Sequence, residues 1–192
     1  MSHHSLRASR RRALALLPAA ALVPAVIAAA SPPPEVAREL PGARLQGSGR
    51  LRFLGLRVYD ARLWAPADAR LGPGDWVRTP LALELEYARE LVGTLIAERS
   101  LEEMRRQAEI PAPRSDAWLA EMKRVFPDVR AGDRLTGVKR PGESARFYAN
   151  GSLRGEVRDA DFARLFFGIW LSEKTSEPGL RAALLGAPRP AS

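Results

Sequence analysis

Few residues in this chain could carry chemistry, because two of the usual reactive side chains are nearly absent. The 192-residue sequence contains no cysteine, and its only two histidines are His3 and His4. Without imidazole or thiol groups beyond that point, Ser-His-Asp and Cys-His catalysis, Cys/His zinc sites and disulfides are excluded. Any chemistry must use arginine, lysine, tyrosine, hydroxyl or carboxylate groups, and we expect no metal and no cofactor.

The charge of the chain gives no sign of a nucleic-acid site. Lysine and arginine number 30 against 22 acidic residues, for a net charge of +8, and four of the arginines lie within residues 1–12. Over the rest of the chain the two signs are interspersed, and no basic stripe of the kind that tracks a phosphate backbone is present. We therefore expect no nucleic-acid partner, and the charge identifies no protein partner either.

The first 30 residues have the pattern of an export signal. Residues 1–12 are basic, and residues 13–30 are uncharged and end in an Ala-x-Ala pattern. This order is typical of a secretory signal peptide, and SRRRAL at residues 9–14 resembles a twin-arginine signal. The alternative is a retained membrane anchor, because an apolar stretch of this length can just span a bilayer. We expect a periplasmic or secreted protein with no further membrane span.

The rest of the chain is expected to form one domain. Residues 31–42 resemble a Pro-rich linker, and residues 43–188 are the expected domain. Residues 45–65 are rich in strand formers, and their apolar pattern changes phase near Tyr59, which indicates a bulge or a break between two strands. Residues 80–87 alternate between apolar and polar or small side chains, as in an antiparallel strand with one wet face.

Helices and a second group of strands follow. Helical spacing begins at Glu90, and Ser100 is expected to cap a second helix through a capping box. Ser115 is expected to cap a third helix. Residues 132–157 have the pattern of a three-strand meander with an Asn-Gly hairpin turn. This order of elements predicts an α+β fold, in which helices cover one face of an antiparallel sheet.

The densest apolar run begins after Asp159 or Asp161, either of which could cap a helix. Its large apolar side chains recur at helical spacing, at Phe162, Leu165, Phe166, Ile169 and Trp170. A helix that is apolar around most of its circumference is buried on more than one side. Ten residues rise about 15 Å, which is too short to cross a membrane. We interpret this run as a core helix, which could also form the wall of a pocket.

Several motifs, taken in order, resemble the chalcone isomerase-like family, in particular its exported bacterial branch. The first is LQGSGRLRFLGLRVYDARLWA, with a Gly-x-Gly, then Val-Tyr, then small-x-Leu-aromatic. PLALELEYARELVGTLIAERSLEEMRRQ resembles the middle of the family, and GDRLTGV with the segment from FYANG to LLG resembles its C-terminal half. The similarity covers about residues 42–186. It implies an open-faced β-sandwich, a large antiparallel sheet with a helical layer over one face.

The resemblance implies less about catalysis than about fold. Plant chalcone isomerases carry a threonine that helps to orient a water on the substrate ketone, and the matching place here is Leu54, which cannot donate that hydrogen bond. The family also places an arginine after its Gly-x-Gly, where it can hold a phenolate or a fatty-acid carboxylate. Leu51 stands there in this chain, between Arg50 and Arg52. Because strand neighbours point to opposite faces, only a bulge would turn one of these arginines inward.

We therefore predict a non-catalytic binder of a small apolar acid, either a fatty acid or an aromatic one. A buried carboxylate needs a charged partner, for which Arg52 and then Arg50 are the candidates. Tyr59 or Tyr87 would donate a hydroxyl hydrogen bond. These four residues are the predicted ligand-binding set, and no catalytic residue is assigned.

Two alternatives remain open at this stage. One is an isomerase, an intramolecular lyase that closes a ring by oxa-Michael addition, which needs only an oriented phenolate and a polarised ketone. The other is a structural or partner-binding exported protein, with a charged helix face at residues 98–107 on which Arg99 could pair with a buried acid. A cavity beside Phe53, Tyr59 and Trp170 would favour a ligand, whereas a filled seam would favour the structural role.

Overall fold

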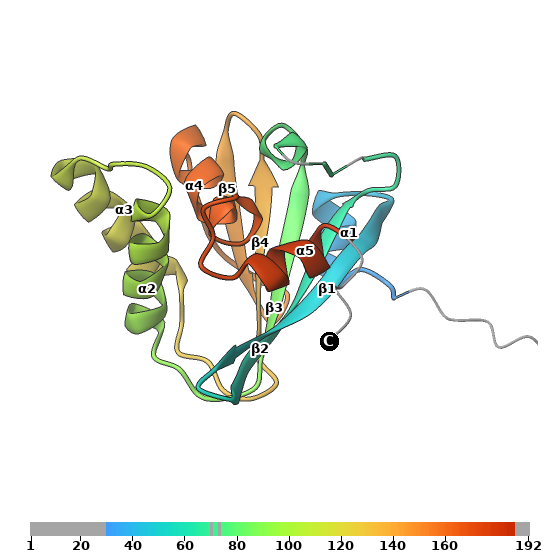
Figure 1. The fold of residues 1–192 in the computed structure, drawn as a ribbon, viewed down its shortest axis with the longest axis horizontal. Coiled ribbons are helices and arrows are strands. Elements are labelled where there is room, and N and C mark those ends of the chain that lie inside the picture. The colour runs from blue at the N-terminus through green and yellow to red at the C-terminus, as the bar shows by residue number, and fades with distance from the viewer. Residues whose placement is uncertain (1–29, 70, 73, 187–192) are drawn as a thin grey trace, which may run out of the picture.

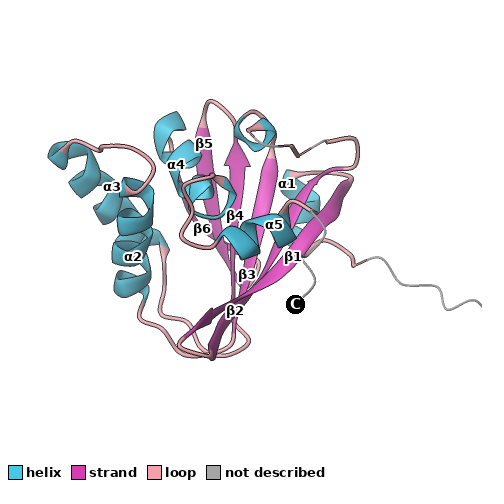
Figure 2. Ribbon diagram, in the orientation of Figure 1, coloured by secondary structure: helices cyan, strands magenta, loops and turns pink. Residues whose placement is uncertain are grey.

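The structure is a computed structural model that describes residues 30–69, 71–72 and 74–186, so the predicted signal peptide falls outside the described residues except for Ala30. Six strands form one antiparallel sheet in chain order (Figures 1 and 2). The strands are β1 Ala43–Phe53, β2 Leu56–Pro66, β3 Leu81–Tyr87, β4 Arg134–Arg140, β5 Ser144–Ala149 and β6 Ser152–Val157. The helices are α1 Pro34–Glu39, the 3-10 helix Asp75–Val77, α2 Gly93–Arg105, α3 Ala112–Val125, α4 Ala160–Leu171 and α5 Pro178–Leu184.

Two hydrophobic clusters lie on the two faces of the sheet. The larger one packs the inward side chains of the strands, such as Leu63 and Leu83, against α2, α3, α4 and α5. The smaller one packs the opposite side chains, such as Trp64 and Ala82, against α1. The predicted α+β, open-faced arrangement is therefore confirmed. Within the described residues, no helix is both long and apolar enough to cross a bilayer.

The segment expected to be a Pro-rich linker contains α1 instead. Pro34 occupies the first turn of this helix, where a missing backbone N–H costs nothing. Val36 is fully buried in the smaller cluster, and the Oε1 atom of Glu35 accepts a hydrogen bond of 2.9 Å from Thr136 Oγ1. Apolar burial and the polar contacts of its two glutamates therefore hold this helix on the sheet face opposite the larger cluster. The proline content of the segment gives no sign of it.

The β1–β2 hairpin contains both features that the phase change near Tyr59 allowed. The strands break at a two-residue turn, Leu54-Gly55, and the register then slips so that Val58 is an extra residue on β2. Such a bulge brings two neighbouring side chains to one side. The Gly-x-Gly motif also has a packing reason, because a Cβ at Gly47 would meet the backbone of α5 and one at Gly49 would meet the side chain of Leu180.

Two predicted helix starts are wrong. The helix from Gly93 to Arg105 is continuous, and Ser100 does not cap it but donates its hydroxyl to the carbonyl of Ile96, 2.7 Å away. A serine hydroxyl can return to the preceding turn in this way without ending a helix. Ser115 likewise lies inside α3, which begins at Ala112.

The C-terminal elements follow the prediction more closely. The meander of β4, β5 and β6 has the expected turns, and Asp159 caps α4 by accepting hydrogen bonds from the amides of Asp161 and Phe162. The predicted core helix is α4, and eight of its 12 residues are buried. Phe162 and Phe166 of this helix stack on each other and meet Phe147 of β5 edge to face, which joins the helical layer to the sheet.

Candidate functional site

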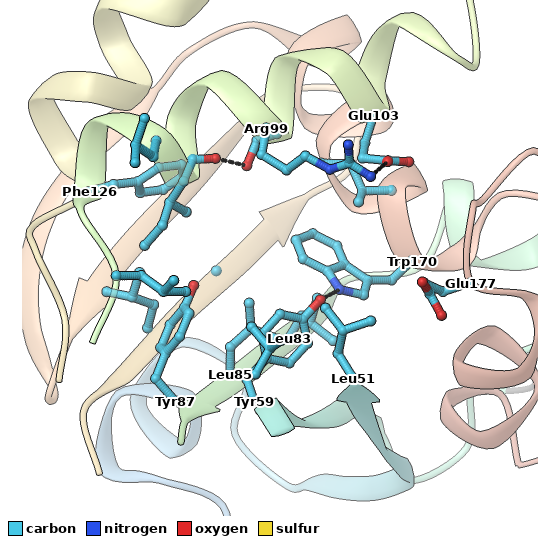
Figure 3. A pocket seen from close by; sticks show the side chains of 18 of the residues that line it. Leu51, Tyr59, Leu83, Leu85, Tyr87, Arg99, Glu103, Phe126, Trp170 and Glu177 are labelled. Atoms are coloured by element: carbon cyan, nitrogen blue, oxygen red, sulfur yellow. Dashed lines mark hydrogen bonds and ion pairs between the residues drawn. The ribbon is translucent and has the colours of Figure 1, made fainter. Parts of the chain in front are cut away.

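A cavity of about 410 Å³ lies between the sheet and the helices α2 and α4 (Figure 3). Most of its wall is aliphatic or aromatic. The apolar side chains that form its interior include Leu83, Leu85, Phe126, Phe147, Phe166 and Ile169. Its volume lies in the lower part of the range of about 300–1,000 Å³ that is usual for small-molecule sites.

Local features of the strands and of α4 create this space. The bulge in β2 lets both Val58 and Tyr59 line the cavity, and Gly137 on β4 contributes no side chain to fill it. From the opposite side, α4 contributes Phe166, Ile169 and Trp170. The predicted core helix therefore also serves as a pocket wall, and the cavity lies where the sequence pointed, beside Phe53, Tyr59 and Trp170.

Two tyrosines contribute hydroxyl groups to the wall of the cavity. The rings of Tyr59 and Tyr87 meet edge to face, with centroids 5.7 Å apart. Trp170 Nε1 donates a hydrogen bond of 2.9 Å to the Tyr59 hydroxyl, as Figure 3 shows. Neither phenol donates its own proton to an acceptor among the described residues. Both hydroxyl groups therefore have a hydrogen bond left to give.

Burial fixes the protonation state of these two phenols. It raises the pKa of Tyr59 well above the ordinary value of 10, more than the Trp170 hydrogen bond lowers it. Burial also raises the pKa of Tyr87 far above that value. Both groups are therefore neutral at physiological pH, so that they can donate hydrogen bonds and do not act as bases.

Arg99 and Glu103 form an ion pair in the wall contributed by α2. Arg99 Nη2 donates to Glu103 Oε1, while Arg99 Nη1 lies 3.3 Å from a carboxylate oxygen of Glu102. The side chain of Glu103 is 8% exposed, and Arg106 Nε approaches its second oxygen at 3.5 Å. The sequence predicted that Arg99 pairs with a buried acid, and this pair confirms it. The charge of Glu103 is therefore compensated within the wall of the cavity.

Arg89 is a second exposed cation in the lining of the cavity, besides Arg99. It is exposed, it lines the cavity, and it forms no ion pair with any described residue. Sequence reasoning missed Arg89. Strand alternation could not have found it, because β3 ends at Tyr87 and Arg89 lies in the bend that follows.

The structure places Tyr59 and Tyr87 at the cavity, but not the two predicted arginines. Arg50 Nε lies 2.6 Å from Asp60 on the opposite face of the sheet, and Arg52 donates to the carbonyl of Gly55 at 3.1 Å. The physical reason is strand alternation. Leu51 between them points into the cavity, and the bulge lies on β2, so it turns neither arginine of β1 inward.

The leucine matched to the catalytic threonine of plant chalcone isomerases is also outside the cavity. Leu54 sits in the hairpin turn and is 86% exposed. The β1–β2 hairpin turns at this residue, so a side chain here faces solvent. Its identity therefore says nothing about which hydrogen bonds the cavity could donate to a ketone.

Comparisons with known proteins agree with this architecture. The family model described as "Chalcone isomerase-like" matches residues 32–186, and the chain therefore belongs to the chalcone isomerase-like family. Among solved structures, a fatty-acid binding protein of Arabidopsis thaliana is similar with a TM-score of 0.59 and 16% identity, over 76% of this chain and 88% of that one. At this identity the likeness shows the fold alone. No curated protein matches the sequence.

Proposed function

We propose that this protein is a non-catalytic binder of a small apolar acid, with fatty acids as the first candidates. The observation that carries the proposal is a largely apolar cavity with two neutral phenol donors in its wall and the exposed Arg89 in its lining. Apolar pockets with a few oriented polar groups are the usual form of a small-molecule site. The family, and a structural neighbour that binds fatty acids, support the same choice.

The acidic group would lie near the opening, between Arg89 and Tyr87. Arg89 supplies a positive charge that no described carboxylate neutralises, whereas Arg99 is already paired with Glu103. A carboxylate accepts well from a guanidinium and from a neutral phenol, and such charge-assisted hydrogen bonds are about twice as strong as neutral ones. This assignment replaces Arg50 and Arg52 as the predicted anion partners.

The apolar part of the ligand would extend inward from that point. The side chains beyond the tyrosines are leucines of β3 and aromatic residues of α4 and β5, and no unpaired cation lies among the described residues there. Removing apolar surface from water stabilises a bound chain by about 25 cal/mol per Å². The cavity therefore favours a ligand with one acidic end and an otherwise apolar body.

The experiment compares dodecanoic acid with dodecanol, which has the same chain and an uncharged end. We expect the acid to bind more tightly by isothermal titration calorimetry. Arg89→Gln should remove about tenfold of the affinity for the acid and little of that for the alcohol, because only the acid pairs with the guanidinium. Arg154→Gln, a change of an exposed arginine on β6 outside the cavity, is the matched control.

Two results would count against this function. Equal affinity for acid and alcohol would remove the acidic group from the recognition. Absence of any heat or thermal shift with either compound, together with no lipid or aromatic acid carried through native mass spectrometry, would remove the ligand altogether.

An isomerase is the second candidate, and the two tyrosines favour it. Phenols that donate into an apolar space could polarise a substrate ketone, which is the electrostatic part of a ring closure by oxa-Michael addition. The measurement is the rate of chalcone cyclisation with purified protein against the spontaneous rate. A rate no higher than the spontaneous one excludes this activity.

We propose further that the protein is an exported, periplasmic or secreted member of the bacterial branch. The support is the basic, apolar and Ala-x-Ala order of residues 1–30. Expression in a Gram-negative host, followed by N-terminal sequencing of the periplasmic fraction, should give a chain that begins at Ser31. A full-length chain in the membrane fraction would indicate a retained anchor instead.

A further inference from the structure

Most large exposed hydrophobic side chains in the described part of the molecule gather at one end of it. We call this group the apolar rim, and its members are Phe53, Leu54, Leu56, Val92 and Leu95. The first three form the tip of the β1–β2 hairpin, at the lower edge of the molecule in Figure 1, and the other two belong to the start of α2. Phe53 and Leu95 also line the cavity. The rim therefore surrounds part of the cavity's opening.

Leu54 is the clearest sign that the rim has a use. It is the most exposed of these side chains, at 86%, and its φ of 49° lies in the left-handed region that disfavours a leucine. Two-residue turns of this kind prefer asparagine or glycine at that position. Asn150 occupies the equivalent place in the β5–β6 turn, with a φ of 48°. An apolar side chain that is both strained and exposed contributes nothing to folding, which points to a role in binding.

Positive charge accompanies the rim. Arg50 and Arg57 share the carboxylate of Asp60, but Arg52 and Arg89 form no ion pair with a described residue. The hairpin tip and the cavity opening thus carry apolar side chains flanked by two unneutralised guanidinium groups. This combination of exposed apolar surface and nearby arginine is what the surface of an anionic bilayer binds.

We propose that the apolar rim docks on the surface of an anionic lipid bilayer, with the hairpin tip inserted among the headgroups and Arg52 and Arg89 against lipid phosphates. A protruding tip enters a fluid interface without a complementary partner shape. A stable protein–protein contact, by contrast, needs about 800 Å² on each side, more than a few side chains at a hairpin end provide. This goes beyond ligand binding, and it directs the cavity opening toward the phase in which apolar acids dissolve.

The experiment uses a fluorescent probe at the tip of the full-length protein. Because the chain has no cysteine, Leu54→Cys gives a single attachment site for an environment-sensitive dye. Leu153→Cys on β6 is the control. Leu153 is 59% exposed and lies four strands from β2, about 19 Å at a spacing of about 4.8 Å. This probe reports the tip itself, whatever residues 1–30 do at a membrane.

With vesicles of phosphatidylglycerol and phosphatidylcholine in equal parts, we expect a blue shift from the dye at position 54 and none from the dye at position 153. In the labelled background, Leu56→Ser should weaken vesicle binding about tenfold, and Leu153→Ser should leave it unchanged. Leu56 and Leu153 are matched in exposure, at 57% and 59%. Arg52→Gln should cost about fivefold at low salt, and added salt should weaken the unmodified protein's binding as well.

Several outcomes would overturn the proposal. They are no shift at position 54, an equal shift at both positions, an equal response to vesicles of phosphatidylcholine alone, and a shift that grows with protein concentration without vesicles. The last would mean that a second copy covers the rim. The test is separate from ligand binding, because Leu56 does not line the cavity and Leu56→Ser should keep the affinity for dodecanoic acid.

Discussion

The two faces of the sheet differ in whether a buried tyrosine hydroxyl donates a hydrogen bond within the protein. We call the face that packs against α1 the open face, and the face under α2 to α5 the covered face. On the open face, the hydroxyl of Tyr148 donates to Glu39, which also receives Arg140 and Arg146. On the covered face, the hydroxyl of Tyr87 donates to no described acceptor. Both tyrosines are almost fully buried. One polar group is thus committed to holding the fold, and the other keeps a hydrogen bond free.

The two Xaa-Gly hairpin turns, Leu54-Gly55 between β1 and β2 and Asn150-Gly151 between β5 and β6, show the same contrast. Asn150 accepts a hydrogen bond of 2.8 Å from the amide of Arg134 and donates one of 3.0 Å to Asp133. Leu54, in the same backbone conformation, has no polar group with which to do so. Side chains whose hydrogen bonds are satisfied within the protein stabilise the fold. Side chains around the cavity that lack such partners, or that are exposed and apolar, indicate where other molecules bind.

Glu84→Ala is the strongest test of whether satisfied polar groups on the open face stabilise the fold. Glu84 is 3% exposed and receives Arg62 Nη1 and Trp64 Nε1, each at 3.0 Å. Its removal leaves the buried indole N–H of Trp64 without an acceptor and leaves Arg62 with Glu86 alone, so we expect a loss of about 3 kcal/mol in the free energy of unfolding. Chemical denaturation measures it.

Glu86→Ala is the matched control for that change. Glu86 lies on the same strand and contacts the same arginine at 3.0 Å, but its side chain is 35% exposed. Exposed ion pairs contribute about 1 kcal/mol or less. A loss as large as that of Glu84→Ala would show that the open face is held by charge pairing in general, and not by the buried acceptor.

The paired variants Tyr148→Phe and Tyr87→Phe test the comparison directly. Tyr148→Phe should lower the free energy of unfolding by about 1–2 kcal/mol, because Glu39 loses a buried donor. Tyr87→Phe should change it by about 0.5 kcal/mol or less, and should instead weaken dodecanoic acid binding about tenfold. Denaturation and calorimetry on both variants give the four values. Equal effects on stability would mean that the two hydroxyls do not differ.

Acid should destabilise the open face through Glu39. Burial raises the pKa of this carboxyl, but the hydrogen bonds from Tyr148, Arg140 and Arg146 together lower it below its ordinary 4.5. A lowered pKa means that the contribution to stability is complete above about pH 4.5 and is lost as the pH falls through the folded-state value. Glu39→Gln should flatten that part of the curve of unfolding free energy against pH. An unchanged slope would contradict this role.

Much of the fold follows from the sequence because strand and helix periods are local signals. The alternation in β3 and the apolar spacing in α4 each identify an element without tertiary information. The predicted helix starts were wrong where a side chain can make two kinds of hydrogen bond. Ser100 could cap a helix, but its hydroxyl donates to the preceding turn instead. The helix α1 was missed because its apolar content is one small buried contact at Val36.

The site was predictable in its apolar part and not in its charges. The apolar run around Trp170 and the two tyrosines lie where the pattern placed them. The arginines depend on which face the side chains of β1 take, and the bulge at Val58 lies on β2 and leaves that alternation unchanged. Sequence periodicity shows that a bulge exists but not which strand carries it, so Arg50 and Arg52 were preferred to Arg89.

The smallest expected effect tests whether Leu54 makes the protein less stable than a residue suited to this turn would. Leu54→Asn should raise the free energy of unfolding by about 0.5–1 kcal/mol, because asparagine tolerates a positive φ and suits this turn. Leu54→Ala should not raise the free energy of unfolding. Alanine is also strained at a positive φ, although it removes the apolar leucine side chain just as asparagine does. Thermal or chemical unfolding should find the asparagine variant more stable and the alanine variant unchanged. The leucine at this tip would then contribute nothing to stability, and the contrast with Asn150 would hold. A stabilisation of similar size in both variants would place the cause in the exposed leucine side chain and not in its backbone.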